Sequence, residues 1–280
     1  MKIFKTKAGI LIEQNGQTYL LEGYQWDAFI NDDKLYVKAL DAIRSQTPFE
    51  NADSVRDFQL EPPIQSQELW AAGVTYSRSK VGRQEESRKS GGGDFYARVY
   101  EAERPELFFK TTNHRIVGPG AQVRIRKDSR WDVPEPELTL VITSSGKIVG
   151  YTIGNDMSSR SVEGENPLYL PQAKTFDGCA SIGPCVYVSE RPLARETLIE
   201  MEIVRNGSRV FGGTVSIAQM KRTPEELVSF LYRECTFPFG SLLMTGTGIV
   251  PANDLTLQSD DRIRITIHPI GVLENTVARN

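Results

Sequence analysis

The sequence predicts an α+β fold that is rich in β-structure, and three observations support this prediction. From residue 106 on, short runs rich in β-branched and aromatic residues alternate with turn residues. A single amphipathic pattern, residues 223–235, interrupts these runs. The preceding third combines a hairpin pattern with charged, helix-compatible stretches. Strands that follow one another without regularly alternating helices favour an antiparallel-rich sheet over βαβ units.

Composition limits the class of protein. Of the 280 residues, 39% are hydrophobic and 25% charged, which is ordinary for a globular chain. The net charge of -3 provides no electrostatic basis for binding nucleic acid or an anionic membrane. No apolar run approaches the roughly 20 residues that span a bilayer, and the N-terminal stretch contains Lys and Gly where a signal peptide has its apolar core. The 3 cysteines form no CxxC pair, which suits a reducing compartment. We therefore expect a cytoplasmic protein with no nucleic-acid or membrane partner.

The first 62 residues are predicted to form a small N-terminal α/β domain. Residues 2–23 have the pattern of two strands joined through Asn15-Gly16, a strong short-range hairpin signal. A polar, helix-compatible stretch follows, and Pro62-Pro63 interrupts the chain. We place the domain boundary there, with the main domain over residues 63–280.

Residues 77–103 are predicted to form a mobile lid. The stretch is highly charged, poor in β-branched residues and interrupted by Gly91-Gly92-Gly93. This composition favours two exposed helical pieces about a flexible hinge, and such segments often close over active sites. The glycine run lacks the strand and the GK[ST] or GxGxxG pattern of a phosphate-binding loop.

The main domain is predicted to be built from successive strands. Turns are expected at Ser145-Gly146 and Asn206-Gly207, and the helix over 223–235 opens at Thr223 with Pro224 in its first turn. The expected strands cover residues 106–112, 121–127, 137–143, 147–156, 185–189, 197–207, 209–216 and 262–271.

Three carboxylates lie at the ends of these predicted strands. Glu135 and Glu137 are two residues apart, so in a strand both point to the same face. Asp156 follows another apolar strand. Three oxygen ligands at neighbouring strand ends suit a hard divalent cation such as Mg²⁺ or Mn²⁺. From spacing alone, a solvated acid pair on an edge strand remains an equal alternative.

Longer motifs connect these acids to a known family. "PEPEL" followed by "GYTIGNDMSSRSVEGENPLYLPQAKTFDGCASIGP", together with "LMTGTGIVP", resembles the catalytic core of the fumarylacetoacetate hydrolase family. Within it, "RPELFFK", "PEPEL" and "ENPLYLPQAK" look closest to the branch of 2-keto-3-deoxy-D-arabinonate dehydratases. The resemblance implies a mixed β-roll core, a small N-terminal domain, and Mg²⁺ (Mn²⁺ or Ca²⁺ as alternatives) held by Glu135, Glu137 and Asp156. It also implies that Lys174 reaches the substrate or a metal-bound oxygen. We expect a homodimer or homotetramer.

Such a site indicates a 2-keto acid as substrate. A 2-keto acid can chelate Mg²⁺ through its carboxylate and keto oxygens, and the metal then stabilises the enolate formed when a C3 proton leaves. Hydrolases, decarboxylases, tautomerases and hydratases can all begin from this enolate. The metal site therefore identifies the substrate class more securely than the reaction.

The reaction is indicated by an absent motif. Hydrolytic family members that cleave acylpyruvates carry GxNYxxHxxE, whose His and Glu activate water, whereas Ser79 and Gly82 stand at those positions here. We therefore predict a dehydratase of a 2-keto-3-deoxy sugar acid such as 2-keto-3-deoxy-arabinonate or -xylonate. The alternatives are an acylpyruvate- or fumarylacetoacetate-type C–C hydrolase, an isomerase or decarboxylase of unsaturated 2-keto diacids, and a non-enzymatic binding module with a decayed site.

Further residues are assigned to substrate and catalysis. Glu106 matches a carboxylate of the dehydratase branch and is the candidate acid/base beside Lys174. Lys110, Thr247, Arg78 and Tyr169 are candidate substrate-binding residues. For Glu106, an exposed acid at a strand start is an equal alternative; Lys110 could pair with it at the surface, and the charged lid could simply face water.

Overall fold

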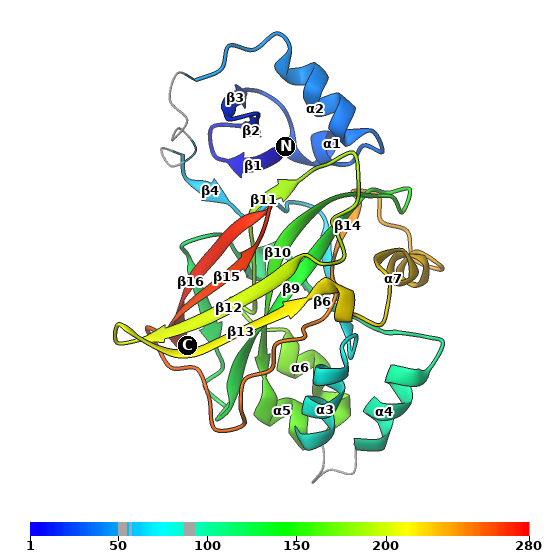
Figure 1. Ribbon diagram of the computed structural model, residues 1–280, viewed down its shortest axis with the longest axis vertical. Coiled ribbons are helices and arrows are strands. Elements are labelled where there is room, and N and C mark those ends of the chain that lie inside the picture. The colour runs from blue at the N-terminus through cyan, green and yellow to red at the C-terminus, as the bar shows by residue number, and fades with distance from the viewer. Residues whose placement is uncertain (50–54, 56–57, 87–92, 280) are drawn as a thin grey trace.

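The computed structural model describes the whole chain except residues 50–54, 56–57, 87–92 and 280 (Figure 1). Its strands form two sheets in these described residues. The larger, of 11 strands, has the main order β3-β2-β1-β11-β10-β9-β14-β5-β6, with β4 paired to β1 and β7 to β11. These strands are β1 (Lys2–Thr6), β2 (Ile10–Gln14), β3 (Gln17–Leu21), β4 (Leu60–Glu61), β5 (Glu68–Gly73), β6 (Glu106–Thr112), β7 (Ile116–Val117), β9 (Asp132–Ile142), β10 (Ile148–Ser159), β11 (Ala180–Tyr187) and β14 (Ser241–Met244).

The smaller sheet, of 5 strands, packs against the larger one in the order β13-β12-β15-β16-β8. Alternate side chains of β12, including Ile199, Met201 and Ile203, are buried and share a hydrophobic cluster with Leu138 and Leu140 of β9. The intervening side chains of β12 are more exposed, so this sheet has one core face and one solvent face. Its strands are β8 (Gln122–Ile125), β12 (Leu198–Arg205), β13 (Ser208–Ser216), β15 (Arg262–Ile267) and β16 (Gly271–Arg279).

The β-rich α+β prediction is confirmed, and so are individual turns. Between β2 and β3, Asn15 and Gly16 have φ values of 52° and 77°. Between β12 and β13, Asn206 and Gly207 have φ values of 49° and 76°. Positive φ at both central residues gives the turn twist that matches paired strands. By contrast, β4, β5, β7, β14 and β16 were not predicted, and the segment before Asn15, predicted as one strand, forms two, β1 and β2. Of the unpredicted strands, β4, β7 and β14 are only 2 to 4 residues long, too short for an alternating pattern.

The helices lie mainly at the two ends of the molecule (Figure 1). Thr223 accepts a hydrogen bond from the N–H of Glu226 and begins the last helix, which ends at Leu231, four residues before the predicted end. None of the helices in the described residues has both the length and the apolar composition to cross a bilayer. They are α1 (Trp26–Ile30), α2 (Leu35–Ile43), α3 (Ser77–Glu86), α4 (Gly93–Glu101), α5 (Arg160–Glu165), α6 (Leu170–Lys174) and α7 (Pro224–Leu231).

The N-terminal residues extend the large sheet. β1 pairs antiparallel with β11, with Lys2 opposite Tyr187, and α1 and α2 pack on a second hydrophobic cluster that β1, β2 and β11 share. The predicted domain boundary after residue 62 falls between β4 and β5 and stays a prediction. The predicted lid contains α3 and α4; Gly93 begins α4, while Gly91 and Gly92 lie outside the described residues.

Candidate metal centre and active site

The three predicted carboxylates converge because β9 and β10 are paired neighbours. Asp156 lies directly opposite Glu135, and Glu137, two residues further along β9, projects from the same face. One oxygen from each side chain lies within 4.8 Å of the others, and all three residues are at most 3% exposed. A buried group of three acids is stable only if cations compensate the charge.

Three cationic side chains pair with two of these acids, Glu135 and Asp156. Lys174 Nζ, at the end of α6, donates to Glu135 Oε2 at 2.7 Å, to Asp156 Oδ2 at 2.8 Å and to Ser158 Oγ at 2.6 Å. Arg160 Nη2, in the first turn of α5, donates to Glu135 Oε1 at 2.8 Å. Lys110 Nζ lies 2.6 Å from Asp156 Oδ1. Burial alone would raise the pKa of Asp156, but the two lysines outweigh it and lower that pKa.

Glu137 is the acid with a different environment. The donor recorded for its carboxylate in the described residues is the backbone N–H of Gly246, at 2.5 Å from Oε2. Burial, followed by the negative charges of Asp156 and Glu135, raises the pKa of Glu137 well above its usual value. A divalent cation beside Glu137 would stabilise the charged carboxylate and so counteract the rise in its pKa. The all-oxygen donor set therefore fits a hard metal ion such as Mg²⁺.

A β-bulge determines where Lys110 lies. Leu69 of β5 pairs with Thr111 and Trp70 pairs with Phe109, so Lys110 has no partner residue on β5. Its side chain is fully buried, and Nζ also donates to the carbonyl of Met157 at 3.0 Å and to that of Lys174. Lys110 therefore contacts the acids' own strand and is not the surface partner of Glu106 that was weighed as an alternative.

A small cavity opens beside the carboxylates. The ends of β5 and β6, the start of α3 and the loop after β14 form its other walls. Glu106 begins β6 opposite Gly73, and its Oε2 is buried with no hydrogen-bond partner among the described residues. The residues that line the cavity are Ala72, Gly73, Val74, Ser79, Phe108, Glu135, Glu137, Asp156, Arg160, Lys174 and Thr247.

Of the other predicted site residues, one lies at the cavity and two lie away from it. Thr247 lines the cavity, and its Oγ1 accepts from the N–H of Ile249 at 3.2 Å. Arg78 is exposed on α3 and Tyr169 is 40% exposed; neither lines the cavity. Sequence reasoning passed over Arg160 and Gly73. Arg160 could have been suspected, since it follows Asp156 by four residues in the same motif.

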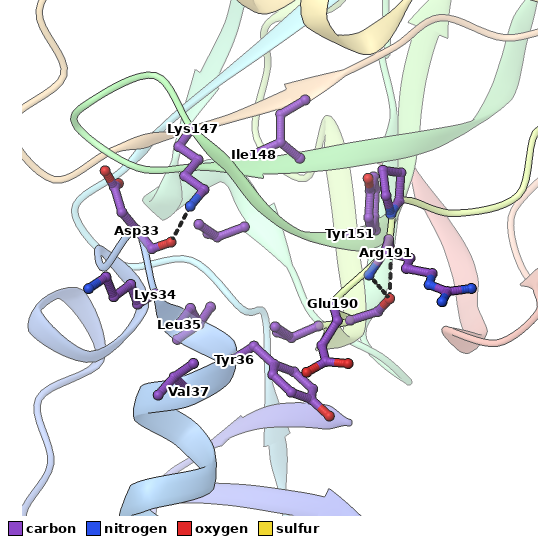
Figure 2. A pocket seen from close by; sticks show the side chains of 14 residues that line it. Asp33, Lys34, Leu35, Tyr36, Val37, Lys147, Ile148, Tyr151, Glu190 and Arg191 are labelled. Atoms are coloured by element: carbon purple, nitrogen blue, oxygen red, sulfur yellow. Dashed lines mark hydrogen bonds between the residues drawn. The ribbon is translucent and has the colours of Figure 1, made fainter.

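A roomier cavity, of about 400 Å³, lies elsewhere, between α2 and the start of β10 (Figure 2). Lys147 Nζ donates to the carbonyl of Asp33 across it at 2.7 Å, and the side chains of Tyr36 and Glu190 project into the same region (Figure 2). None of the triad acids lines this cavity. We therefore place the chemistry at the smaller, carboxylate-lined cavity.

Comparison with known proteins identifies the family to which the chain belongs. Residues 78–278 match the model of the fumarylacetoacetate hydrolase C-terminal domain. The chain belongs to the fumarylacetoacetate hydrolase family. The matched segment contains the triad acids, both buried lysines and Thr247, which confirms the family resemblance inferred from the motifs.

The similar family members include sugar-acid dehydratases. The chain is 48% identical over 233 residues, 81% of this chain and 79% of the relative, to a probable 2-keto-3-deoxyxylonate dehydratase of Haloferax volcanii. It is 42% identical to the 2-dehydro-3-deoxy-D-arabinonate dehydratase of Saccharolobus solfataricus, covering 80% of this chain and 76% of that one. Among solved structures, 2-keto-3-deoxy-D-arabinonate dehydratase complexed with magnesium and 2,5-dioxopentanoate matches with a TM-score of 0.85 and 34% identity, over 100% and 99% of the two chains.

Proposed function

We propose that this protein is a Mg²⁺-dependent dehydratase of a 2-keto-3-deoxy sugar acid of five carbons, such as 2-keto-3-deoxy-arabinonate or -xylonate. The observation that carries this proposal is the buried Glu135–Glu137–Asp156 triad, with Glu106 paired opposite Gly73, one of the residues that line the cavity. The two dehydratase relatives and the magnesium-containing structure support the same substrate class.

Glu137, Glu135 and Asp156 would hold the metal, with Lys174 bridging the last two. When bound, the metal supplies a Lewis acid that stabilises negative charge on a chelated 2-keto acid. Lys174 and Arg160 keep the carboxylates oriented, because each makes a charge-assisted hydrogen bond to Glu135. Thr247, across the cavity, can position the substrate carboxylate.

Glu106 is the proposed acid/base. Its buried Oε2 accepts no hydrogen bond within the described residues, so it is available to take a proton from C3 of the substrate. The C3–H electrons form the C3=C4 bond as the C4–O bond breaks, and the proton on Glu106 can leave with the hydroxyl as water. A proton shift from C5 to C3 then gives the enol of the aldehyde, and the product is 2,5-dioxopentanoate.

The remaining assignments are also proposals. We infer a homodimer or homotetramer in the cytoplasm, a substrate-responsive lid over residues 77–103, and Arg78 and Tyr169 as contacts made when that lid closes. The free thiols of Cys179, Cys185 and Cys235 support a reducing compartment.

Product analysis tests the function. The protein is incubated with Mg²⁺ and either a 2-keto-3-deoxypentonate or an acylpyruvate, and the products are identified by mass spectrometry. We expect 2,5-dioxopentanoate from the sugar acid and little cleavage of the acylpyruvate, since Ser79 and Gly82 replace the residues that activate water. Release of pyruvate from the acylpyruvate, with no turnover of the sugar acid, would overturn the proposal.

A further inference from the structure

A short segment after β13 contacts both ends of the α3–α4 unit. Met220 forms an isolated antiparallel bridge with Tyr76, and the N–H of Lys221 donates to the carbonyl of Thr75 at 2.9 Å. These contacts fix the chain just before α3. The same segment then reaches α4 through the side chains of Lys221 and Arg222. The points where the α3–α4 unit leaves and rejoins the core are therefore held by three consecutive residues.

Lys221 binds the last turn of α4. Its Nζ donates to the carbonyl of Tyr100 at 2.5 Å and to the carboxylate of Glu101 at 2.7 Å. The hydrogen bond to Lys221, followed by the charge of the same lysine, outweighs desolvation and lowers the pKa of Glu101. A cation at a helix C-terminus also interacts favourably with the helix dipole.

Arg222 completes the cap. Its guanidinium donates to the carbonyl of Glu103 at 3.0 Å and to that of Ala102, and it is oriented by Glu226 of α7, 2.6 Å from Nη1. The residue is only 8% exposed. The guanidinium of arginine presents five donors in one rigid plane, whereas a lysine ammonium is a compact charge with three donors on a flexible stem. Lys221 and Arg222 together are the Lys221–Arg222 clamp.

Contacts connect the clamp to the cavity. The ring of Tyr100 lies 4.4 Å from Lys221 Nζ and 4.5 Å from Lys80 Nζ, both within cation–π range. Lys80 belongs to α3 and is adjacent to Ser79, which lines the carboxylate cavity. Figure 1 shows α3 between α4 and α5, and α5 is the helix that begins with Arg160. A continuous chain of contacts thus connects the end of α4 to α3, which forms one wall of the cavity.

We propose that Lys221 and Arg222 are positioning residues of the active site: they hold α4, and through Tyr100 and Lys80 they hold α3, over the bound substrate. This inference rests on the proposed function for its substrate and goes beyond it in naming what fixes the helices. The clamp touches none of the triad acids, so it controls how tightly the substrate is retained and leaves the bond-breaking step unaffected.

The test compares Lys221→Met, Arg222→Lys and a matched control, Arg195→Met. Lys221 has a partly exposed side chain, and methionine keeps its length without the charge. Arg222→Lys keeps the charge while losing the planar fork. Arg195 is an exposed arginine in the loop before β12 and has no ion pair among the described residues. Hydrogen exchange of the α4 amides is measured against that of α2 in the same protein, because α2 packs on the other hydrophobic cluster and contacts neither clamp residue among the described residues. The values of kcat and KM are measured with Mg²⁺ and the 2-keto-3-deoxypentonate.

We expect exchange in α4 to rise by at least about tenfold in both clamp variants, the effect of one charge-assisted hydrogen bond, with exchange in α2 and in the control variant unchanged. KM should rise by a similar factor while kcat stays within about twofold. Unchanged exchange in α4, or a fall in kcat at constant KM, would overturn the clamp. If the unmodified protein does not turn over the acid, the proposed function fails, and the exchange measurement alone decides the clamp.

Discussion

Replacing Gly73 with Ala should disable Glu106 without touching it chemically. A Cβ on Gly73 would lie 2.0 Å from Glu106 Oε2 and 2.5 Å from its Cδ. Such contacts do not occur below about 3 Å, so the carboxylate must move by roughly 1 Å. A misplacement of that size at a reacting group costs on the order of 10²-fold in rate, which corresponds to about 2.7 kcal/mol of transition-state stabilisation. The backbone at residue 73 is outside the left-handed region, so alanine itself is tolerated there.

The assay is steady-state kinetics on Gly73→Ala, Glu106→Ala and the double variant, with the melting temperature of each recorded to establish that it folds. We expect kcat to fall about 10²-fold in Gly73→Ala, with KM nearly constant. In the Glu106→Ala background there is no carboxylate to displace, so the second substitution should add little. Multiplicative losses in the double variant, or full activity in Gly73→Ala, would refute the assignment of Glu106.

Two further perturbations test the electrostatics. Glu137→Gln should lower the affinity for Mg²⁺, measured by calorimetry, by at least about tenfold. In EDTA the melting temperature of this variant should be no lower than that of the unmodified protein, because a neutral amide replaces a buried carboxylate of raised pKa. Undiminished affinity for Mg²⁺ would exclude Glu137 as a ligand. Burial raises the pKa of the Cys185 thiol to about 12, whereas the thiol of the unfolded chain ionises near 9.0. Between these pH values the unfolded chain therefore binds fewer protons than the folded protein, and the free energy of unfolding falls as the pH rises. Relative to Cys185→Ala, this fall should reach up to about 1.4 kcal/mol per pH unit. Parallel denaturation profiles of the two proteins between pH 9 and 11 would contradict this.

The acids could be predicted from the sequence because a local rule places them. Side chains two residues apart on a strand share a face, and that puts Glu135 and Glu137 together before any tertiary information is available. The Asn15-Gly16 and Asn206-Gly207 turns were equally accessible, because their conformation is encoded in two adjacent residues. The family motifs added the position of Lys174, which no periodicity indicates.

Other parts of the site depend on contacts between distant residues. The bulge at Lys110 comes from the pairing of β5 with β6, whose sequences separately give no sign of an extra residue. Gly73 reads as an ordinary strand-end glycine until Glu106 is seen packed against it. The Lys221–Arg222 clamp precedes α7 in the chain and acts on α4, about 120 residues earlier. Nothing in the sequence around Lys221 and Arg222 distinguishes them from a solvated pair of basic residues.

The charge arrangement also bears on the substrate. Lys110, Lys174 and Arg160 pair with Asp156 and Glu135, and their three formal positive charges equal the three formal negative charges of the triad. A divalent ion bound at Glu137 then leaves the cavity with surplus positive charge. A small carboxylic acid that brings its own negative charge and further oxygen ligands neutralises that surplus, whereas a neutral sugar does not. The cationic side chains thus favour an anionic keto acid as substrate, and they also keep the buried carboxylates charged and oriented.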